Sequence, residues 1–367
     1  MTGLIIVFIL HNLLALSLYS RSRSCHYSAI KSDNYIFLLV FFLALALLGL
    51  QTGDYFSYID LVKNASGILH SNPDYDGYIT HMEPIYNYLA YFVGGNHMLW
   101  RLVVFGSSFI IIFLFARKLG FNYYYFLFFF TILCLSSFLV GRMYWGVALF
   151  FSAIAIFREQ KKWWALFLCV CAAFAHKSLY ILPALIPFVF LRFNKRFLFV
   201  SVFIYLLLSF ILNHLFGDLS ILSLFFADLD KSIMVYTEGE ITGSVFGYSI
   251  GERIVYLSKF MAGSLIYLSL VYKVIIKKAE VPVFVHSFLI LITIILLLAA
   301  VLNSGHFGDG TIVYRYIELI YYPSIFLFCY EIRQKIMPRI HRNLTVFLAF
   351  FSFESSMILS MYYFTVG

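Results

Sequence analysis

The sequence has little charge and little proline. Of its 367 residues only 12% are Asp, Glu, Lys or Arg, and seven are proline. Hydrophobic residues make up 62% of the chain, and its mean hydropathy is +0.90. A soluble domain this apolar would carry more hydrophobic surface than its interior could bury. We therefore expect lipid to form part of the solvent around this protein.

Motifs of soluble enzymes and of metal sites are also lacking. No phosphate-binding P-loop, dinucleotide fingerprint, H-E-x-x-H motif or G-x-S-x-G elbow stands in a plausible setting. The five cysteines lie in or beside apolar runs, and Cys169 and Cys171 are spaced C-x-C. We predict neither a disulfide framework nor a zinc site from them. No cofactor and no metal is expected.

What is present is a series of long apolar runs. A helix needs about 20 apolar residues to cross the hydrocarbon, and runs near this length recur along the chain. The first run is followed, not preceded, by Arg21 and Arg23, which is the reverse of the charge order in a cleavable signal. We predict an all-α, polytopic transmembrane bundle of about twelve spans. The predicted spans are 4–20, 35–51, 97–116, 123–140, 143–157, 163–176, 178–191, 197–216, 254–276, 282–302, 314–330 and 344–364.

Basic residues cluster in six short loops, which hold 18 of the 26 Lys and Arg residues but only four acids. By the positive-inside rule these loops are cytoplasmic, and alternation of the spans then puts both termini on the periplasmic side. Because the basic residues do not form one patch, the net charge of +8 does not indicate a nucleic-acid partner. The loops lie near residues 21–31, 117–118, 158–162, 192–196, 273–278 and 333–342.

Two polar, acidic stretches are predicted to be periplasmic loops, at 51–96 and 217–252. The first contains the segment from Pro84 to Asn96, which is too short to cross a membrane. Its Pro start and Gly-Gly end predict an interfacial or re-entrant helix. With no internal repeat and no soluble domain, we predict one integral membrane domain over 1–367.

Several basic residues lie within apolar runs or at their outer ends. Arg101, Arg142, Arg253 and Arg315 are predicted at a similar depth, near the periplasmic boundary. A charged side chain inside a membrane span is energetically costly, so it indicates a functional role. The alternative is that the side chain extends to the membrane interface (snorkelling), which is favoured for Lys259. Arginine binds phosphate through a planar pair of donors. We predict that these four arginines form an outward cationic pocket for a lipid phosphate or diphosphate.

Candidate general bases and sugar-binding groups accompany the arginines. His176 ends an apolar run in AFAHKSLYILP, and Glu83 opens the short helix in HMEPIYNYL. Histidine and carboxylates are the usual general bases. The predicted outer side is also rich in tyrosine, which offers a flat apolar face and a hydroxyl to a sugar ring. We predict sugar-binding roles for Tyr314, Tyr86 and Asp54.

Five motifs, in their order along the chain, resemble the EpsG branch of Wzy-type polymerases of O-antigen, capsule and exopolysaccharide. They are GDYFSYIDLV, EPIYNYLAYF, GRMYWGVALF, AAFAHKSLYILP and VYRYIELIYYP. The resemblance implies a metal-independent membrane glycosyltransferase, in which a growing glycan leaves undecaprenyl diphosphate for a hydroxyl of a second lipid-linked repeat unit. The developing charge on the diphosphate would need stabilisation, which we assign first to Arg142 and Arg315. The proton acceptor is left open between His176 and Glu83.

The resemblance also implies a multi-pass protein of the bacterial inner membrane. Its partners would be undecaprenyl-diphosphate-linked oligosaccharides, membrane lipid, a flippase and a chain-length regulator, with no nucleic acid. Two alternatives need a similar outer pocket. A lipid-linked oligosaccharide flippase or transporter would also need access from the cytoplasm, and no matching intramembrane charge lies on that side. A glycan ligase would share the donor site completely, so composition does not separate it from a polymerase.

Overall fold

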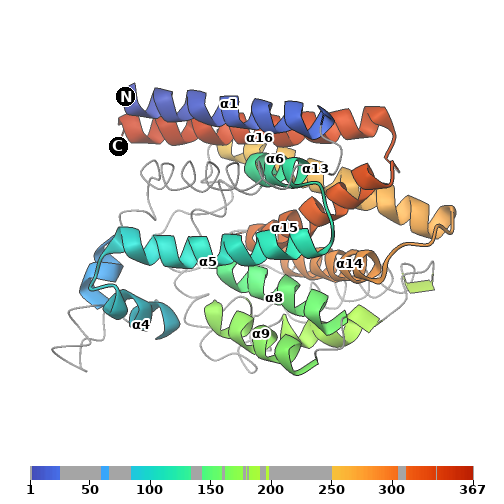
Figure 1. Cartoon of the computed structure of the whole chain (residues 1–367), viewed down its shortest axis with the longest axis horizontal. Helices are drawn as coiled ribbons and strands as arrows, with labels where there is room; N and C mark the ends of the chain where they lie inside the picture. Colours follow the sequence, from blue (N-terminus) through green and yellow to red (C-terminus); the bar gives the residue numbers. More distant parts are fainter. Residues whose placement is uncertain are drawn as a thin grey trace. The chain divides into compact units, whose positions relative to one another are not determined.

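The computed structural model describes helices in most of the predicted spans (Figure 1). All elements in the described part of the chain are helical, so the all-α prediction is confirmed there. Outside the described residues lie the predicted span 35–51, nearly all of 197–216 and most of both long loops. The described residues are 2–24, 59–65, 84–133, 143–158, 162–176, 179, 182–190, 196–197, 250–304, 311–335 and 337–366.

Two of the described helices are long and apolar enough to cross a membrane by length and composition, over His97–Leu114 and Leu257–Ile276. Shorter apolar helices accompany them, as expected if the chain is a membrane protein. The twelve crossings and the periplasmic termini stay predictions. The shorter apolar helices are Tyr124–Leu133, Trp145–Ile154, Trp163–Ala175 and Val283–Leu298.

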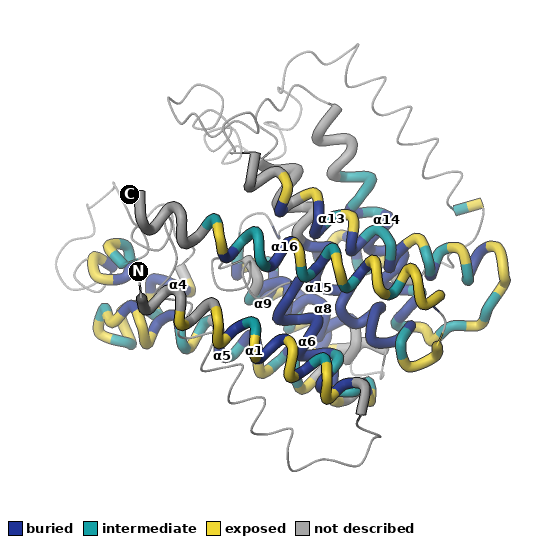
Figure 2. Tube along the Cα trace, turned by 90° about the horizontal axis from the view of Figure 1, so that it is seen from above, coloured by how far each residue is buried: buried dark blue, intermediate teal, exposed yellow. Residues whose placement is uncertain are grey.

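The chain forms two compact units. Unit 1 comprises Met1–Ile186, Phe328–Ile336 and Ala349–Gly367, and unit 2 comprises Pro187–Leu327 and Met337–Leu348. Figure 2 shows the continuous burial of α8 and the alternating burial along α1. The helices that begin in unit 1 are α1 (Thr2–Ser24), α4 (Pro84–Phe92), α5 (His97–Lys118), α6 (Tyr123–Leu133), α8 (Met143–Arg158), α9 (Lys162–Ala175) and the 3₁₀ helix η4 (Pro183–Phe190).

Within unit 1, α8 packs along α9 and against α5, and α1 packs against α6. The α8–α9 contact is close because Gly146 has no side chain. A Cβ at this position would clash with Leu179 and would lie only 2.9 Å from the carbonyl oxygen of Ala172. Gly146 is the second glycine of the GRMYWGVALF motif. Among the described glycines, it is the one at which two helices approach most tightly.

The turn between α4 and α5 follows from its sequence. Gly94 and Gly95 adopt φ values of +62° and +73°, a left-handed conformation that glycine enters without steric cost. The Gly95 N–H donates to the carbonyl oxygen of Ala90 at 2.9 Å and so ends α4. Asn96 then caps α5, because its Oδ1 accepts the N–H of Leu99 at 3.1 Å. A helix follows Pro84, as predicted, and the turn after it brings α4 back beside the start of α5. Its interfacial or re-entrant position stays a prediction.

The C-terminal part of the chain adds to unit 1 through contacts with α1. The His11 ring stacks on Phe353 with 5.1 Å between ring centroids. Next to it, the Asn12 side-chain amide donates to Glu354 at 3.4 Å. These polar groups lie near the middle of two predicted spans.

Unit 2 contains the helices that carry the later arginines. In unit 2, Tyr267 and Thr293 join α13 to α14 by a hydrogen bond of 2.6 Å between their hydroxyl oxygens. Lys259 of α13 is buried, with 3% of its surface exposed, which differs from the snorkelling that the sequence favoured. The described helices after η4 are α13 (Ile250–Val271), the π-helix η5 (Tyr272–Ile276), α14 (Val283–Ser304), α15 (Thr311–Arg333) and α16 (Arg339–Val366).

Candidate functional site

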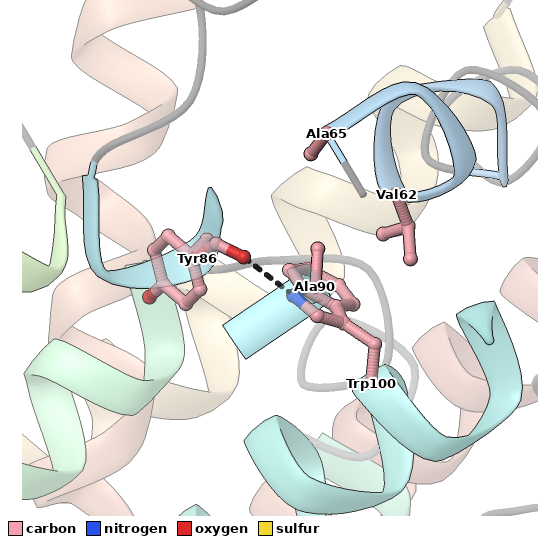
Figure 3. Packing of buried hydrophobic residues seen from close by; sticks show 5 residues of the cluster. All are labelled: Val62, Ala65, Tyr86, Ala90 and Trp100. Atoms are coloured by element: carbon pink, nitrogen blue, oxygen red, sulfur yellow. Dashed lines mark hydrogen bonds between the residues drawn. The ribbon is translucent and has the colours of Figure 1, made fainter. Parts of the chain in front are cut away.

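Four helix ends of unit 1 meet in one region, formed by α4, the start of α5, the start of α8 and the end of α9. We call it the outer end of unit 1, after its predicted position. Tyr86 of α4 joins three of these ends, because its ring makes edge contacts with Trp100 and Trp145 at centroid distances of 5.7 and 6.0 Å. The Trp100 indole N–H donates to the carbonyl oxygen of Tyr86 at 3.1 Å (Figure 3).

A small hydrophobic cluster attaches residues 59–65 to this region. Figure 3 shows the two helical segments and the tryptophan that form it. Tyr86 is only 1% exposed, so its described contacts are packing contacts. Its sugar-binding role stays a prediction. The cluster consists of Val62, Ala65, Tyr86, Ala90 and Trp100.

Basic side chains converge beside this cluster. Arg101 is 4% exposed and His97 is 7% exposed, while Lys63 is exposed to solvent. Arg101 lies one turn after His97 on α5, and Lys63 lies in the segment that docks on this helix. The His97 ring also lies nearly parallel to that of Trp100, with centroids 6.4 Å apart. The structure thus buries Arg101 and places His97 and the segment with Lys63 near it, two residues that the sequence did not single out as site residues.

His176 lies directly after α9 and is half-buried. Its carbonyl oxygen accepts the N–H of Leu179 at 2.8 Å. The preceding residue, Ala175, faces Gly146 in the first turns of α8. The structure therefore brings the end of α9 next to the start of α8, which directly follows Arg142 in the sequence.

Three predicted site residues lie outside the described residues. Arg142 immediately precedes α8, and Glu83 immediately precedes α4, so their neighbours in the chain belong to the outer end of unit 1. Asp54 has no such described neighbour.

Three further predicted residues belong to unit 2. Arg253 lies in the first turn of α13, and Tyr314 and Arg315 lie near the start of α15. The backbone of each is described, while the side chains lie outside the description. Gly263 of α13 faces Ser324 of α15, so the two helices pack together within unit 2.

Trp145 is a residue that sequence reasoning missed. Its indole nitrogen is buried and has no hydrogen-bond partner among the described residues. Because an indole N–H can only donate, it would suit a hydroxyl or carbonyl oxygen of a ligand. The signal that could have found it is its place in GRMYWGVALF, between Arg142 and Gly146.

Within the described ranges, no group of three or more His, Cys, Asp or Glu side chains lies close enough together to hold a metal ion. The histidines of unit 1 that the structure describes are instead spread over separate positions, at His11, His97 and His176. The chemistry that the described residues offer here is hydrogen bonding and positive charge.

Comparison with protein families gives a match to the EpsG family model over residues 34–366. The match covers all five motifs that suggested the resemblance. No curated protein and no solved structure matches the chain. Since the family model spans most of the sequence, this chain is a member of the EpsG family.

Proposed function

We propose that this EpsG-family chain is a polysaccharide polymerase of the bacterial inner membrane. It joins undecaprenyl-diphosphate-linked repeat units at the periplasmic face, in a chain with about twelve crossings and both termini outside. Family membership supports this function. The observation that supports a site is that, in unit 1, α8 packs against both α5, which carries buried Arg101, and α9, which ends directly before His176.

The reaction proposed is a glycosyl transfer with a diphosphate leaving group. The bond between the anomeric carbon and the diphosphate oxygen breaks, and a new bond forms from that carbon to the acceptor hydroxyl oxygen. Undecaprenyl diphosphate leaves with the electron pair, so its charge must be stabilised. Arg142 and Arg315 bind this leaving group through charge-assisted hydrogen bonds, with Arg253 as a third member of the donor site. Arg101 is the fourth predicted phosphate-binding arginine.

The acceptor hydroxyl must lose its proton, and His176 and Glu83 remain the two candidates to accept it. His176 lies at the outer end of unit 1, and Glu83 is the chain neighbour of α4, which belongs to that end. His176 is half-buried beside the α8–α9 contact, where a ring nitrogen can be held in place and still reach a substrate. Glu83 directly precedes Pro84, at the start of the helix that carries Tyr86.

Purified protein in detergent micelles, supplied with lipid-linked repeat units, tests the function directly. A polymerase forms glycan chains on a gel without any membrane to cross. A flippase leaves single units, because micelles have no second side. A ligase transfers glycan to a different acceptor and forms no ladder. Single units alone, with correctly folded protein, would contradict the polymerase proposal.

Site variants then test the residues, in cells that lack the native protein and express each variant equally. Arg142→Ala and Arg315→Ala should each reduce polymer formation about 10²–10³-fold, since each removes a contact made in the transition state. Arg315→Lys should also lose activity, because an ammonium lacks the planar pair of donors. Arg339→Ala is the matched control, because Arg339 is exposed at the start of α16.

Two results would change the assignment of roles. Full-length polymer from both arginine-to-alanine variants would end the leaving-group assignment. Full-length polymer from His176→Ala would move the base role to Glu83, and the same result from Glu83→Gln would reject both candidates.

A further inference from the structure

We propose that the outer end of unit 1 contains a separate lipid-diphosphate site, in which Lys63, His97 and Arg101 bind the diphosphate of the acceptor substrate. The inference rests on the proposed polymerase activity, because that reaction holds two lipid-linked molecules at once. One molecule loses its diphosphate as the leaving group. The other keeps its diphosphate and needs a site that binds it without reaction.

The three basic groups come from two elements that the fold presses together. His97 and Arg101 are four residues apart on α5, which puts them on one face of that helix. Residues 59–65 dock on this helix through Val62, which packs in the cluster with Trp100. Lys63 directly follows Val62 in the chain, so the docking brings Lys63 to the start of α5. A segment distant in sequence thus adds a third basic group to the pair on α5.

The electrostatics of this cluster favour a bound anion. Arg101 and His97 are both at least nine-tenths buried. Water therefore screens the Arg101 charge poorly, while the His97 imidazole offers a ring N–H donor. The amino-terminal end of α5 adds the positive end of a helix dipole at the same place. Bringing like charges together raises the local positive potential, and a phosphate group lowers the energy of that arrangement.

The adjacent helix offers a surface for the lipid tail. Along α4, Tyr86 and Ala90 face the cluster, whereas Ile85, Tyr88 and Phe92 are exposed. The exposed residues follow helical spacing and form one apolar side of α4, and Phe92 is 80% exposed. A polar head site beside an exposed apolar helix face suits an amphiphile with a diphosphate head and an isoprenoid chain.

The position of the cluster favours the acceptor over the donor. The donor diphosphate must lie at the reacting carbon, next to the base. Figure 1 shows α8 between α5, which carries Arg101, and α9, which ends before His176, and α8 packs against both. Neighbouring helix axes are about 8–10 Å apart, so the helices that carry these two residues are separated by one helix layer. In the acceptor, the diphosphate and the reacting hydroxyl are at opposite ends of a repeat unit, which matches this separation.

The test uses two acceptors that cannot act as donors, at a saturating concentration of lipid-linked donor in detergent. The first is the repeat unit on isoprenoid diphosphate with a methylene in place of the anomeric oxygen. The second is the same repeat unit as a plain isoprenyl glycoside, without diphosphate. The ratio of their kcat/KM values measures how much the enzyme gains from the acceptor diphosphate.

We expect wild-type protein to prefer the diphosphate acceptor. Arg101→Ala should lower this preference about 10- to 100-fold, the loss expected for a charge-assisted contact, and Lys63→Ala by less because Lys63 is exposed. The donor KM and the kcat/KM for the plain glycoside should not change. Lys63→Glu keeps the fold, since the residue is exposed, and should lower the preference by charge repulsion even if Arg101→Ala fails to fold. Arg339→Ala is the control for loss of an exposed basic residue.

Four outcomes would overturn the proposal, and they are distinguishable. Equal kcat/KM for both acceptors in wild-type protein would show that the acceptor diphosphate is not bound, while polymerase activity stands. A raised donor KM with an unchanged acceptor ratio would assign the cluster to the donor. If the substitutions changed only the stimulation of activity by added phosphatidylglycerol, the cluster would be assigned to a phospholipid headgroup. Absence of product from wild-type protein with natural substrate would instead remove the polymerase function itself.

Discussion

The close contact of α8 with α9 makes Gly146→Ala an informative substitution. The new Cβ would clash with Leu179 and would lie 2.9 Å from the Ala172 carbonyl oxygen and 3.0 Å from Ala175 Cβ. Leu179 can change its rotamer, but the Ala172 oxygen belongs to the backbone of α9. The two helices must therefore move apart to admit one methyl group.

The free energy of this change can be worked out from the distances. Carbon–carbon contacts are optimal at about 3.5–4.0 Å, so α8 and α9 would have to separate by roughly 0.5–1 Å. Overpacking of this kind costs about 1–3 kcal/mol. Replacing a helical glycine by alanine contributes about 1 kcal/mol in the opposite direction. Because the short contact is with the backbone, the cost of overpacking should lie in the upper part of this range. We therefore expect Gly146→Ala to lower the free energy of unfolding by about 1–2 kcal/mol.

Gly263→Ala is the matched control in unit 2. Its Cβ would lie 3.5 Å from Ser324 Oγ and 3.9 Å from side-chain atoms of Ile320 and Tyr321, which are ordinary contacts. The same substitution at this helical glycine should therefore be neutral or should stabilise the protein by up to about 1 kcal/mol.

The assay compares wild-type protein and both variants in the same detergent, by the monodisperse fraction that remains after heating. A change of 1 kcal/mol shifts the midpoint by about 2–4 °C for chains of 150–250 residues. Gly146→Ala should lower the midpoint by a few degrees, and Gly263→Ala should not. A midpoint for Gly146→Ala equal to or above that of Gly263→Ala would refute the close packing of α8 on α9.

Three further predictions address the outer end and the topology. Trp100→Phe removes the buried indole hydrogen bond to α4 and should cost about 1–3 kcal/mol by the same heating assay, whereas Trp163→Phe, on a side chain exposed at the start of α9, should cost nothing measurable. Asn96→Ala removes the cap of α5 and should cost about 1 kcal/mol, with Asn96→Gly closer to wild type; equal midpoints for all three proteins would contradict the cap. In intact cells, a membrane-impermeant thiol reagent should label a cysteine placed at Asn64 but not one at Lys161, and labelling at the second position would reverse the proposed orientation.

Local sequence was sufficient to predict most helices of the described part. The run predicted at 97–116 corresponds to α5, and the run predicted at 254–276 corresponds to α13 followed by η5. The helix after Pro84 was also predictable, together with its end at Gly94 and Gly95. These features depend on residues close together in the chain: apolar length, a proline start and glycines that accept a left-handed backbone.

The individual roles within the site were harder to predict, because they depend on what packs around each side chain. Tyr86 was selected for its ring and hydroxyl, yet the structure buries it between Trp100 and Trp145. Lys259 was expected to snorkel, yet it is buried in unit 2. A long side chain can extend to the membrane interface only where the neighbouring helices leave space for it. The spacing of residues in the sequence does not show where that space is.

The sequence by itself determined the membrane-protein composition, the helical runs and the family, because each depends on residue types and their order. Only the tertiary structure decided which helices meet. It brought residues 59–65, which include Lys63, to the start of α5, and it brought the end of α9 to Gly146. Such contacts depend on shape: a glycine lets two helices approach, and a buried tryptophan lets a distant segment dock. The convergence of basic groups at the outer end of unit 1 is therefore a consequence of packing, and no local pattern in the sequence predicts it.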